Sequence, residues 1–152
     1  MRKETQNKLT VEAMTRRDRD RVLPMVHDFY QSDAVAHAVE ECVLERAFEA
    51  AVSDNPRLNG FLLYAEGRLV GYAYLTYLYA AESGECVMIE ELFFRDECRG
   101  KGYGTQFFAW LKQAYPDVDR FRLELTEENE AAERLYRKIG FVPLEYKQMI
   151  WE

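Results

Sequence analysis

Apolar positions along this chain follow two periods, and each period predicts one type of secondary structure. In the first third of the chain they recur every three or four residues, which is typical of helices with one buried face. Between Phe61 and Phe94 they alternate with polar residues or form tyrosine-rich runs, which favours strands. Met25 and Met149 are expected in the core. The predicted strands are 9–13, 61–64, 69–79, 86–94, 121–125, 141–142 and 146–151, and the predicted helices are 17–30, 39–51, one that follows residue 104 and ends near 115, and 129–139.

Turn signals between these segments indicate how they are connected. Thr15, with Asp18 three residues later, is a typical helix start, and Gly140 is a typical helix end. The short connections at 66–67 and 83–84 contain glycine, so the three central strands are expected to form an antiparallel meander. The order of elements predicts an α+β (mixed α/β) fold with a mixed, mostly antiparallel sheet and about four flanking helices.

Length and charge limit the class of protein. With 152 residues, 48% of them hydrophobic and 31% charged, the chain matches one globular domain, expected over residues 9–152 behind a flexible segment at 1–8. The net charge of −7 disfavours a nucleic-acid-binding surface and fits a small cationic partner better. The longest apolar stretch, 69–81, is too short to span a bilayer, so no membrane partner is expected.

Cysteine and histidine usage gives no sign of a metal site or of a disulfide framework. The three cysteines form no close pair, and two histidines are too few for a histidine-rich site. The N-terminal segment carries basic residues without an apolar stretch behind them, so it does not read as a signal peptide. Reduced thiols and a cytoplasmic location are therefore expected.

A glycine-rich loop between a predicted strand and a predicted helix is the most informative stretch for chemistry. Glycines stand at three alternate positions, Gly100, Gly102 and Gly104, beside the basic residues Arg99 and Lys101. Such glycines let backbone N–H groups converge, and the following helix directs its positive end to the same place, which suits phosphate or pyrophosphate. The loop lacks the serine or threonine of a Walker loop, and its third glycine comes one residue early for a dinucleotide fingerprint.

Two motifs resemble those of the GCN5-related N-acetyltransferase (GNAT) family. Residues 99–104, RGKGYG, resemble the R/Q-x-x-G-x-G/A loop with which that family binds acyl-coenzyme A. Residues 129–141, NEAAERLYRKIGF, resemble its second common stretch, N-x-x-A-x-x-L-Y-x-x-x-G-F. The motifs stand in the same order, and the resemblance covers about residues 9–151. One departure is Cys98, where an aromatic residue is commoner, in a loop that contributes mainly backbone.

The resemblance implies a GNAT-like fold with acetyl-CoA as co-substrate. The pyrophosphate would bind the N–H groups of the loop, and the pantetheine arm would pair with the strand at 92–94, where the family separates its fourth and fifth strands. Asn129 would contact the pantetheine arm, serve as a helix N-cap, or do both. Tyr136 would donate a proton to the leaving thiolate, or be a packed core tyrosine. The implied cofactor-binding residues are Leu92, Phe93, Phe94, Arg99, Gly100, Lys101, Gly102, Tyr103, Gly104, Thr105, Asn129 and Tyr136.

Two adjacent acids, Glu90 and Glu91, lie in the strand that leads to the loop. Ionised carboxylates are costly in a core strand, so the pair indicates either a function or a salt bridge at the strand end. Adjacent strand residues point to opposite faces, so only one is expected to face the cleft. The acceptor amine arrives protonated and needs a base. Polyamine-type members of the family carry an acid at the position that matches Glu90. Glu90 is therefore preferred as the base, and Glu91 is the second candidate. The expected catalytic residues are Glu90, Glu91 and Tyr136.

The acceptor side carries no motif. The candidates there, by location alone, are Tyr30, Asp33, His37, Tyr77 and Glu82. We expect an N-acetyltransferase that moves an acetyl group directly to a primary amine of a polyamine-like or other small cationic molecule, without a metal. The alternatives are a non-catalytic acyl-CoA sensor or interaction module on the same fold, a protein amine acetyltransferase, and a phosphate- or nucleotide-binding domain of another class. A homodimer is compatible with the resemblance, because dimers are common in the family.

Overall fold

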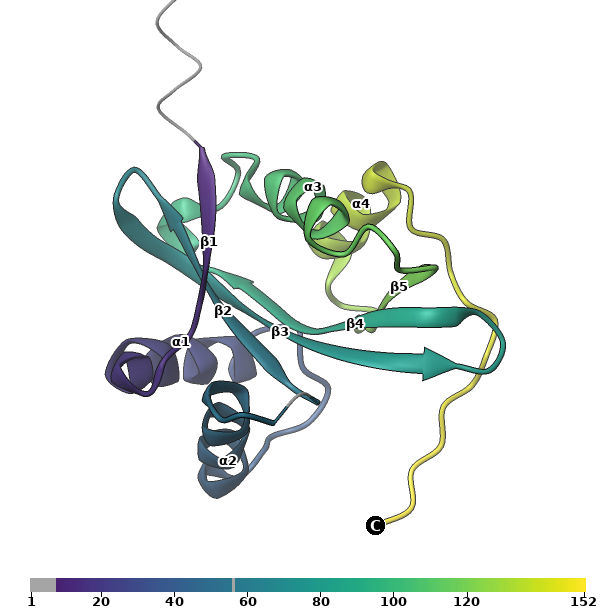
Figure 1. The fold of residues 1–152 in the computed structure, drawn as a ribbon, viewed down its shortest axis with the longest axis horizontal. Helices are drawn as coiled ribbons and strands as arrows, with labels where there is room; N and C mark the ends of the chain where they lie inside the picture. Colours follow the sequence, from purple (N-terminus) through teal and green to yellow (C-terminus); the bar gives the residue numbers. More distant parts are fainter. Residues whose placement is uncertain (1–7, 56) are drawn as a thin grey trace, which may run out of the picture.

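A five-stranded sheet separates two pairs of helices in the computed structural model, which describes residues 8–55 and 57–152 (Figure 1). The strands are β1 (Leu9–Ala13), β2 (Asn59–Ala65), β3 (Arg68–Ala80), β4 (Gly84–Phe94) and β5 (Arg120–Leu123). The helices are α1 (Arg19–Tyr30), α2 (Glu41–Val52), α3 (Tyr103–Ala114) and α4 (Glu130–Ile139), with 3-10 turns η1 (Arg16–Asp18) and η2 (Asp96–Cys98). The expected α+β class is confirmed. Residues 1–7 of the expected flexible N-terminus lie outside the described residues.

Strands that follow one another in the sequence are also neighbours in the sheet. The order is β1-β2-β3-β4-β5, antiparallel except for the parallel pair β4-β5. Between β2 and β3 the chain turns at Glu66 and Gly67, whose φ values of 54° and 73° fit a tight two-residue hairpin. β5 runs parallel to β4 because α3 carries the chain back across the sheet between them. The expected meander and mixed sheet are confirmed.

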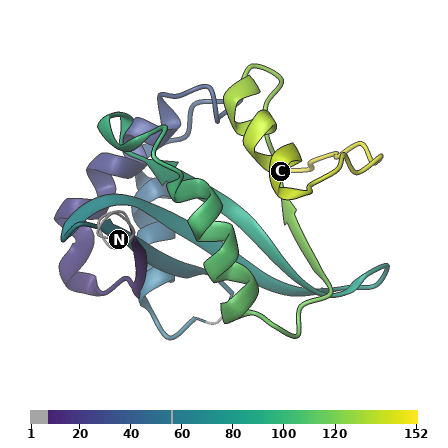
Figure 2. The same cartoon turned by 90° about the horizontal axis from the view of Figure 1, so that it is seen from above.

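Each face of the sheet has its own hydrophobic core. α1 and α2 cover one face, where Phe48 of α2 packs with Tyr72 of β3. α3 and α4 cover the other face, where Phe107 of α3 packs with Val87 of β4 (Figure 2). Because both faces are covered, the middle of β3 is apolar on both sides, which explains why its sequence does not alternate strictly.

The helices begin and end close to the predicted positions. Before α1, the N–H and Oγ1 of Thr15 donate to Asp18 Oδ2 at 2.8 and 3.0 Å, as the spacing of these residues predicts. α4 ends at Gly140, whose φ of 121° takes the chain out of the helix. No helix in the described part of the chain combines the length and the apolar character needed to cross a membrane.

The two closing strands expected at 141–142 and 146–151 are not formed. Residues 141–152 contain neither helix nor strand, and Met149, expected in the core, is 94% exposed. The segment runs past the tip of the β3–β4 hairpin and away from the sheet (Figure 1). An alternating pattern indicates a tendency to form a strand, but a strand forms only beside an edge within hydrogen-bonding reach. Met25 is buried as expected.

Candidate active site

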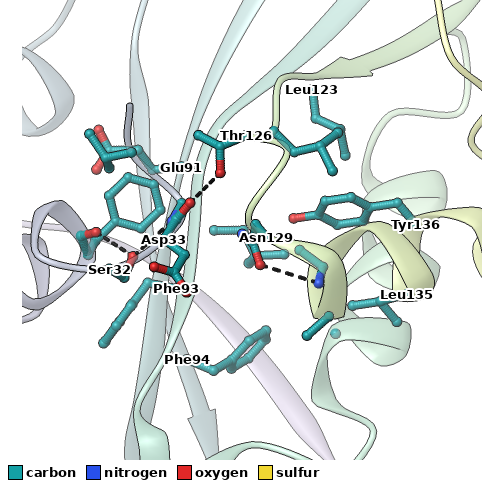
Figure 3. A pocket seen from close by; sticks show the side chains of 18 of the residues that line it. Ser32, Asp33, Glu91, Phe93, Phe94, Leu123, Thr126, Asn129, Leu135 and Tyr136 are labelled. Carbon is teal, nitrogen blue, oxygen red and sulfur yellow. Dashed lines mark hydrogen bonds between the residues drawn. The ribbon is translucent and has the colours of Figure 1, made fainter. Parts of the chain in front are cut away.

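β4 and β5 pair over only part of their length, and their divergence opens a cleft. Cys86–Ile89 of β4 pair with Arg120–Leu123 of β5. β4 then continues to Phe94 without a described strand on that side. A cleft of about 1060 Å³ lies here, lined by β4, the glycine-rich loop, the start of α3, α4 and the loop after α1 (Figure 3). The strand separation that the resemblance implies is therefore present.

The glycine-rich loop has the backbone conformation that its sequence predicts. Gly100 and Gly102 have φ values of 75° and 80°, in the left-handed region that glycine adopts without strain. A Cβ on either residue would meet nothing within 4 Å, so these glycines are needed for conformation and not for space. Gly102 is the N-cap of α3, so the positive end of that helix lies beside the cleft. This arrangement suits a phosphate group.

Gly104 has a different role from the other two glycines. It lies in the first turn of α3, where a Cβ would come within 2.6 Å of Leu135 Cδ2 on α4. The absence of a side chain therefore allows α3 and α4 to pack closely. As a result, α4 lies at the edge of the cleft and its N-terminal turn forms part of the wall.

All the expected cofactor-binding residues except Lys101 line the cleft. Lys101 is exposed and lies outside the lining. Arg99 is fixed against the loop, since its Nε donates to the Phe94 carbonyl oxygen at 3.2 Å and its Nη1 lies 3.3 Å from Asp96 Oδ1. Among the described lining residues Arg99 is the one cation, so an anion there would be bound mainly by Arg99 and by backbone N–H groups.

α4 presents Asn129 and Tyr136 to the cleft. The Asn129 side chain accepts a hydrogen bond from the Ala132 N–H at 3.4 Å, so its role as N-cap is present in the chain alone. The Tyr136 ring packs against Phe108 and Phe141, with centroids 5.7 and 5.8 Å away, and its hydroxyl points into the cleft (Figure 3). Burial raises the pKa of Tyr136 to about 12, so the hydroxyl is protonated at neutral pH.

A β-bulge in β4 brings both adjacent acids to the cleft. Glu91 lies opposite Tyr74 and Ile89 lies opposite Leu75, which leaves Glu90 without a partner residue on β3. The bulge interrupts the alternation of side chains, and both Glu90 and Glu91 line the cleft. The expectation that only one of them faces it is wrong, because it assumed a regular strand.

The two acids differ in environment. Glu91 is half-buried, and its Oε1 and Oε2 accept hydrogen bonds from the hydroxyls of Tyr72 and Tyr30 at 2.7 and 2.8 Å. Burial raises the pKa of Glu91, the two hydrogen bonds oppose the rise, and the nearby charge of Glu90 adds to it. Glu90 is exposed and accepts a hydrogen bond from Thr76 Oγ1 at 3.1 Å. Glu91 is therefore held in place, whereas Glu90 is open to a ligand.

The loop after α1 forms the acceptor-side wall. Of the candidates there, Tyr30 and Asp33 line the cleft. The other three, His37, Tyr77 and Glu82, lie outside the lining. Thr126, in the loop before α4, donates from Oγ1 to the Asp33 carbonyl oxygen and joins the two loops (Figure 3).

Two residues of the site carry no sequence signal that separates them from packing residues. Tyr72 is fully buried among aromatic rings, yet its hydroxyl holds Glu91. A buried tyrosine hydroxyl needs a hydrogen-bond partner. The acid in the next predicted strand was the only sequence feature that pointed to such a partner for Tyr72. Thr126 lies outside both motifs. Its role in joining the loop before α4 to the loop after α1 depends on the two loops lying side by side in the fold.

Residues 23–141 match the acetyltransferase (GNAT) family. The matched region includes both motifs, the diverging strands and every residue that lines the cleft. This chain belongs to the GNAT family. It is therefore an acetyl-CoA-dependent N-acyltransferase by class.

Individual relatives are distant in sequence but close in fold. Thialysine N-epsilon-acetyltransferase of Sus scrofa is 27% identical over 74 residues, 47% of this chain and 44% of that enzyme, so the match spans less than half of the relative. The Mus musculus enzyme of that name is 23% identical over 130 residues, 78% of this chain and 75% of that enzyme. A possible acetyltransferase from Clostridium difficile 630 superimposes with a TM-score of 0.78 at 17% identity, covering 95% of this chain and 97% of that one. An aminoglycoside N-acetyltransferase in complex with CoA gives 0.73 at 15% identity, covering 96% and 95%.

Replacing Gly102 tests the loop as the cofactor site. Gly102→Val forces a β-branched residue into the left-handed region, so we expect acetyl-CoA affinity to fall at least ~10-fold in isothermal calorimetry. Gly102→Asn is the matched control, because asparagine tolerates this conformation, and it should retain most of the affinity. Unchanged binding by the valine variant would refute the assignment of the loop.

Proposed function

We propose that this protein transfers an acetyl group from acetyl-CoA to a primary amine of a small cationic molecule. The charge of the cleft carries this proposal. Six carboxylates line the cleft against the single guanidinium of Arg99: Asp33, Glu90, Glu91, Glu124, Glu128 and Glu130. A concave lining with this excess of negative charge raises the local concentration of cations. The names of the thialysine and aminoglycoside N-acetyltransferases, whose acceptors are amines of small molecules, support the same class of acceptor.

The cofactor end of the cleft fits acetyl-CoA in shape and in polar groups. The left-handed glycines and the start of α3 would bind the pyrophosphate, with Arg99 beside it. The pantetheine amides would pair with the backbone of β4 between Glu90 and Phe94, where the divergence of β5 leaves room. This placement directs the thioester toward the bulge and the Tyr136 hydroxyl. Lys101, outside the lining, is left as a surface charge near the phosphates.

Glu90 is proposed as the base. Acetyl-CoA supplies an acetyl group activated as a thioester, and an alkylammonium with a pKa near ~10.4 must lose a proton before its nitrogen can attack. Glu90 accepts that proton, directly or through water, because its carboxylate is exposed in the cleft. The nitrogen then forms the C–N bond as the C–S bond breaks, and it gives its second proton to the leaving thiolate or to water, which leaves a neutral amide. Glu91, already bonded by two tyrosines, stabilises the cation and is the second candidate for the base.

Tyr136 is proposed to stabilise the leaving thiolate. A free thiol has a pKa near ~8.5, below the value of about 12 for Tyr136, so complete proton transfer from this tyrosine would be uphill. A hydrogen bond from its hydroxyl to the developing charge on sulfur is favourable, and the fixed ring holds the hydroxyl in place for it.

An acceptor screen tests the proposed function. With acetyl-CoA, thiol release should be rapid for small molecules that carry two or more amines and at least ~10-fold slower for matched molecules with one amine. Peptides with a free N-terminus or lysine serve as the comparison set. Faster turnover of the peptides would contradict the small-molecule acceptor and would indicate that the acceptor is an amine of a protein. Binding of acetyl-CoA without turnover of any amine would favour a sensor.

Tyr136→Phe removes the hydroxyl and leaves the ring. We expect kcat to fall roughly 100-fold while the Kd for acetyl-CoA stays within about twofold, because the hydroxyl acts on charge that develops only during the reaction. Tyr79→Phe is the control, since Tyr79 is 74% exposed and lies outside the cleft. An unchanged kcat for the Tyr136 variant would exclude the role at the sulfur.

Glu90→Gln should weaken turnover most at low pH. Near pH 7 the amine is protonated, so loss of the base should cost roughly 100-fold, and the deficit should shrink as pH rises toward the amine pKa of ~10.4. Glu12→Gln, at an exposed position of β1, controls for the lost charge. If Glu91→Gln shows the larger pH-dependent deficit, Glu91 is the base instead.

A further inference from the structure

Glu91 is a half-buried carboxylate that has hydrogen-bond donors beside it but no cation. The titratable and charged groups that act on it are Tyr30 from α1, Tyr72 and Tyr74 from β3, and the adjacent Glu90 of β4. No lysine, arginine or histidine in the described part of the chain forms an ion pair with it. An anion withdrawn from water without a counter-charge is costly, so its ionisation depends on the hydrogen bonds that it accepts.

Each oxygen of this carboxylate has a tyrosine donor of its own. The Tyr72 hydroxyl donates to Glu91 Oε1 at 2.7 Å, and the Tyr30 hydroxyl donates to Oε2 at 2.8 Å. Burial and the charge of Glu91 raise the pKa of both tyrosines, so both hydroxyls stay protonated and act as donors. Hydrogen bonds to a charged acceptor favour its charged form. The two tyrosines therefore oppose burial, which raises the pKa of Glu91.

The two donors come from different elements of the fold, and their rings are fixed. Tyr72 is fully buried in β3, and its ring packs against Tyr74 and Phe93, with centroids 5.2 and 5.8 Å away. Tyr30 is the last residue of α1, directly before the loop that forms the acceptor-side wall. The carboxylate of Glu91 is thus held in one orientation, and the bond from Tyr30 also joins that wall to β4.

We propose that Tyr30 and Tyr72 are positioning residues that keep Glu91 ionised and in one orientation, so that it binds the ammonium group that a small cationic acceptor retains during the reaction. This inference rests on the proposed function, because it assigns part of acceptor binding to Glu91. Glu90 remains the proposed base, since a carboxylate whose two oxygens both accept hydrogen bonds is the weaker proton acceptor. The adjacent acids then have different roles, proton removal and cation binding.

Tyr74 provides a matched control within the same cluster of rings. It is 1% exposed and lies opposite Glu91 on β3, yet its hydroxyl has no hydrogen-bond partner among the described residues. Tyr74→Phe therefore removes a buried hydroxyl without removing a donor to the carboxylate. Tyr72→Phe and Tyr30→Phe each remove one donor and leave the ring in place.

The first test is the titration of the Glu91 side chain, followed by NMR of protein labelled with ¹³C at the glutamate carboxyl groups. The signal is assigned by its loss in Glu91→Gln. Removal of one donor should raise the titration midpoint by roughly 1 pH unit in Tyr72→Phe and in Tyr30→Phe, and Tyr74→Phe should leave the midpoint in place. A midpoint that stays in place in either donor variant, or that rises as far in Tyr74→Phe, would overturn the proposal.

The second test is the pH dependence of KM for an amine acceptor, with putrescine as the diamine probe. Below both titration midpoints, Tyr72→Phe should raise this KM by up to ~10-fold and change kcat less than about twofold, because a smaller fraction of Glu91 is ionised there. Above both midpoints the increase in KM should vanish. An increase of the same size at every pH would show a merely structural role and overturn the proposal.

Failure of the proposed function gives a different result from failure of this inference. The NMR titration needs no substrate, so it tests the effect of the tyrosines on Glu91 whatever the acceptor is. Absence of turnover with any amine contradicts the proposed function and, with it, the assignment of Glu91 to acceptor binding. Turnover of putrescine together with an unmoved titration midpoint contradicts the role of the tyrosines alone.

Discussion

The separation of β4 from β5 beyond Ile89 and Leu123 is the constraint on which the rest of the site depends. Up to that point the parallel pair is held by the backbone ladder and by the core beneath α3. Beyond it, β4 keeps one bonded neighbour, β3, and its other edge faces the cleft. Backbone N–H and C=O groups that are unpaired at a strand edge require hydrogen-bond partners. The separation of β4 from β5 removes such partners from the sheet and so creates a binding site for a ligand with amide groups.

The two ends of the cleft differ in charge because they are built from different kinds of group. At the loop, left-handed glycines and a helix start offer N–H groups to an anion. At the bulge, Glu90 and Glu91 stand together, and one of them is held by two tyrosine hydroxyls. These charges suit an anionic cofactor at the loop and the proposed cationic acceptor at the bulge, and the hydroxyl of Tyr136 is directed into the space between α4 and β4.

Long-range packing, and not local sequence, brings the acceptor wall into place. Gly104 lets α3 approach Leu135 of α4, and the loop before α4 reaches the loop after α1 through Thr126 and the Asp33 carbonyl. These contacts join parts of the chain that are far apart in sequence. Residues 141–152 pair with no described strand of the sheet, so their tendency to form strands is not realised.

The sequence by itself determined the order of elements, the meander, the left-handed loop at Gly100 and Gly102, and the face of α4 that carries Asn129 and Tyr136. These follow from periodicity and from the conformational freedom of glycine, which act over a few residues. Only the tertiary structure decided that Glu90 and Glu91 both face the cleft, that Lys101 does not, and that residues 141–152 leave the sheet. A bulge depends on the register between two strands, and a strand depends on an available edge, so neither can be read from one segment alone.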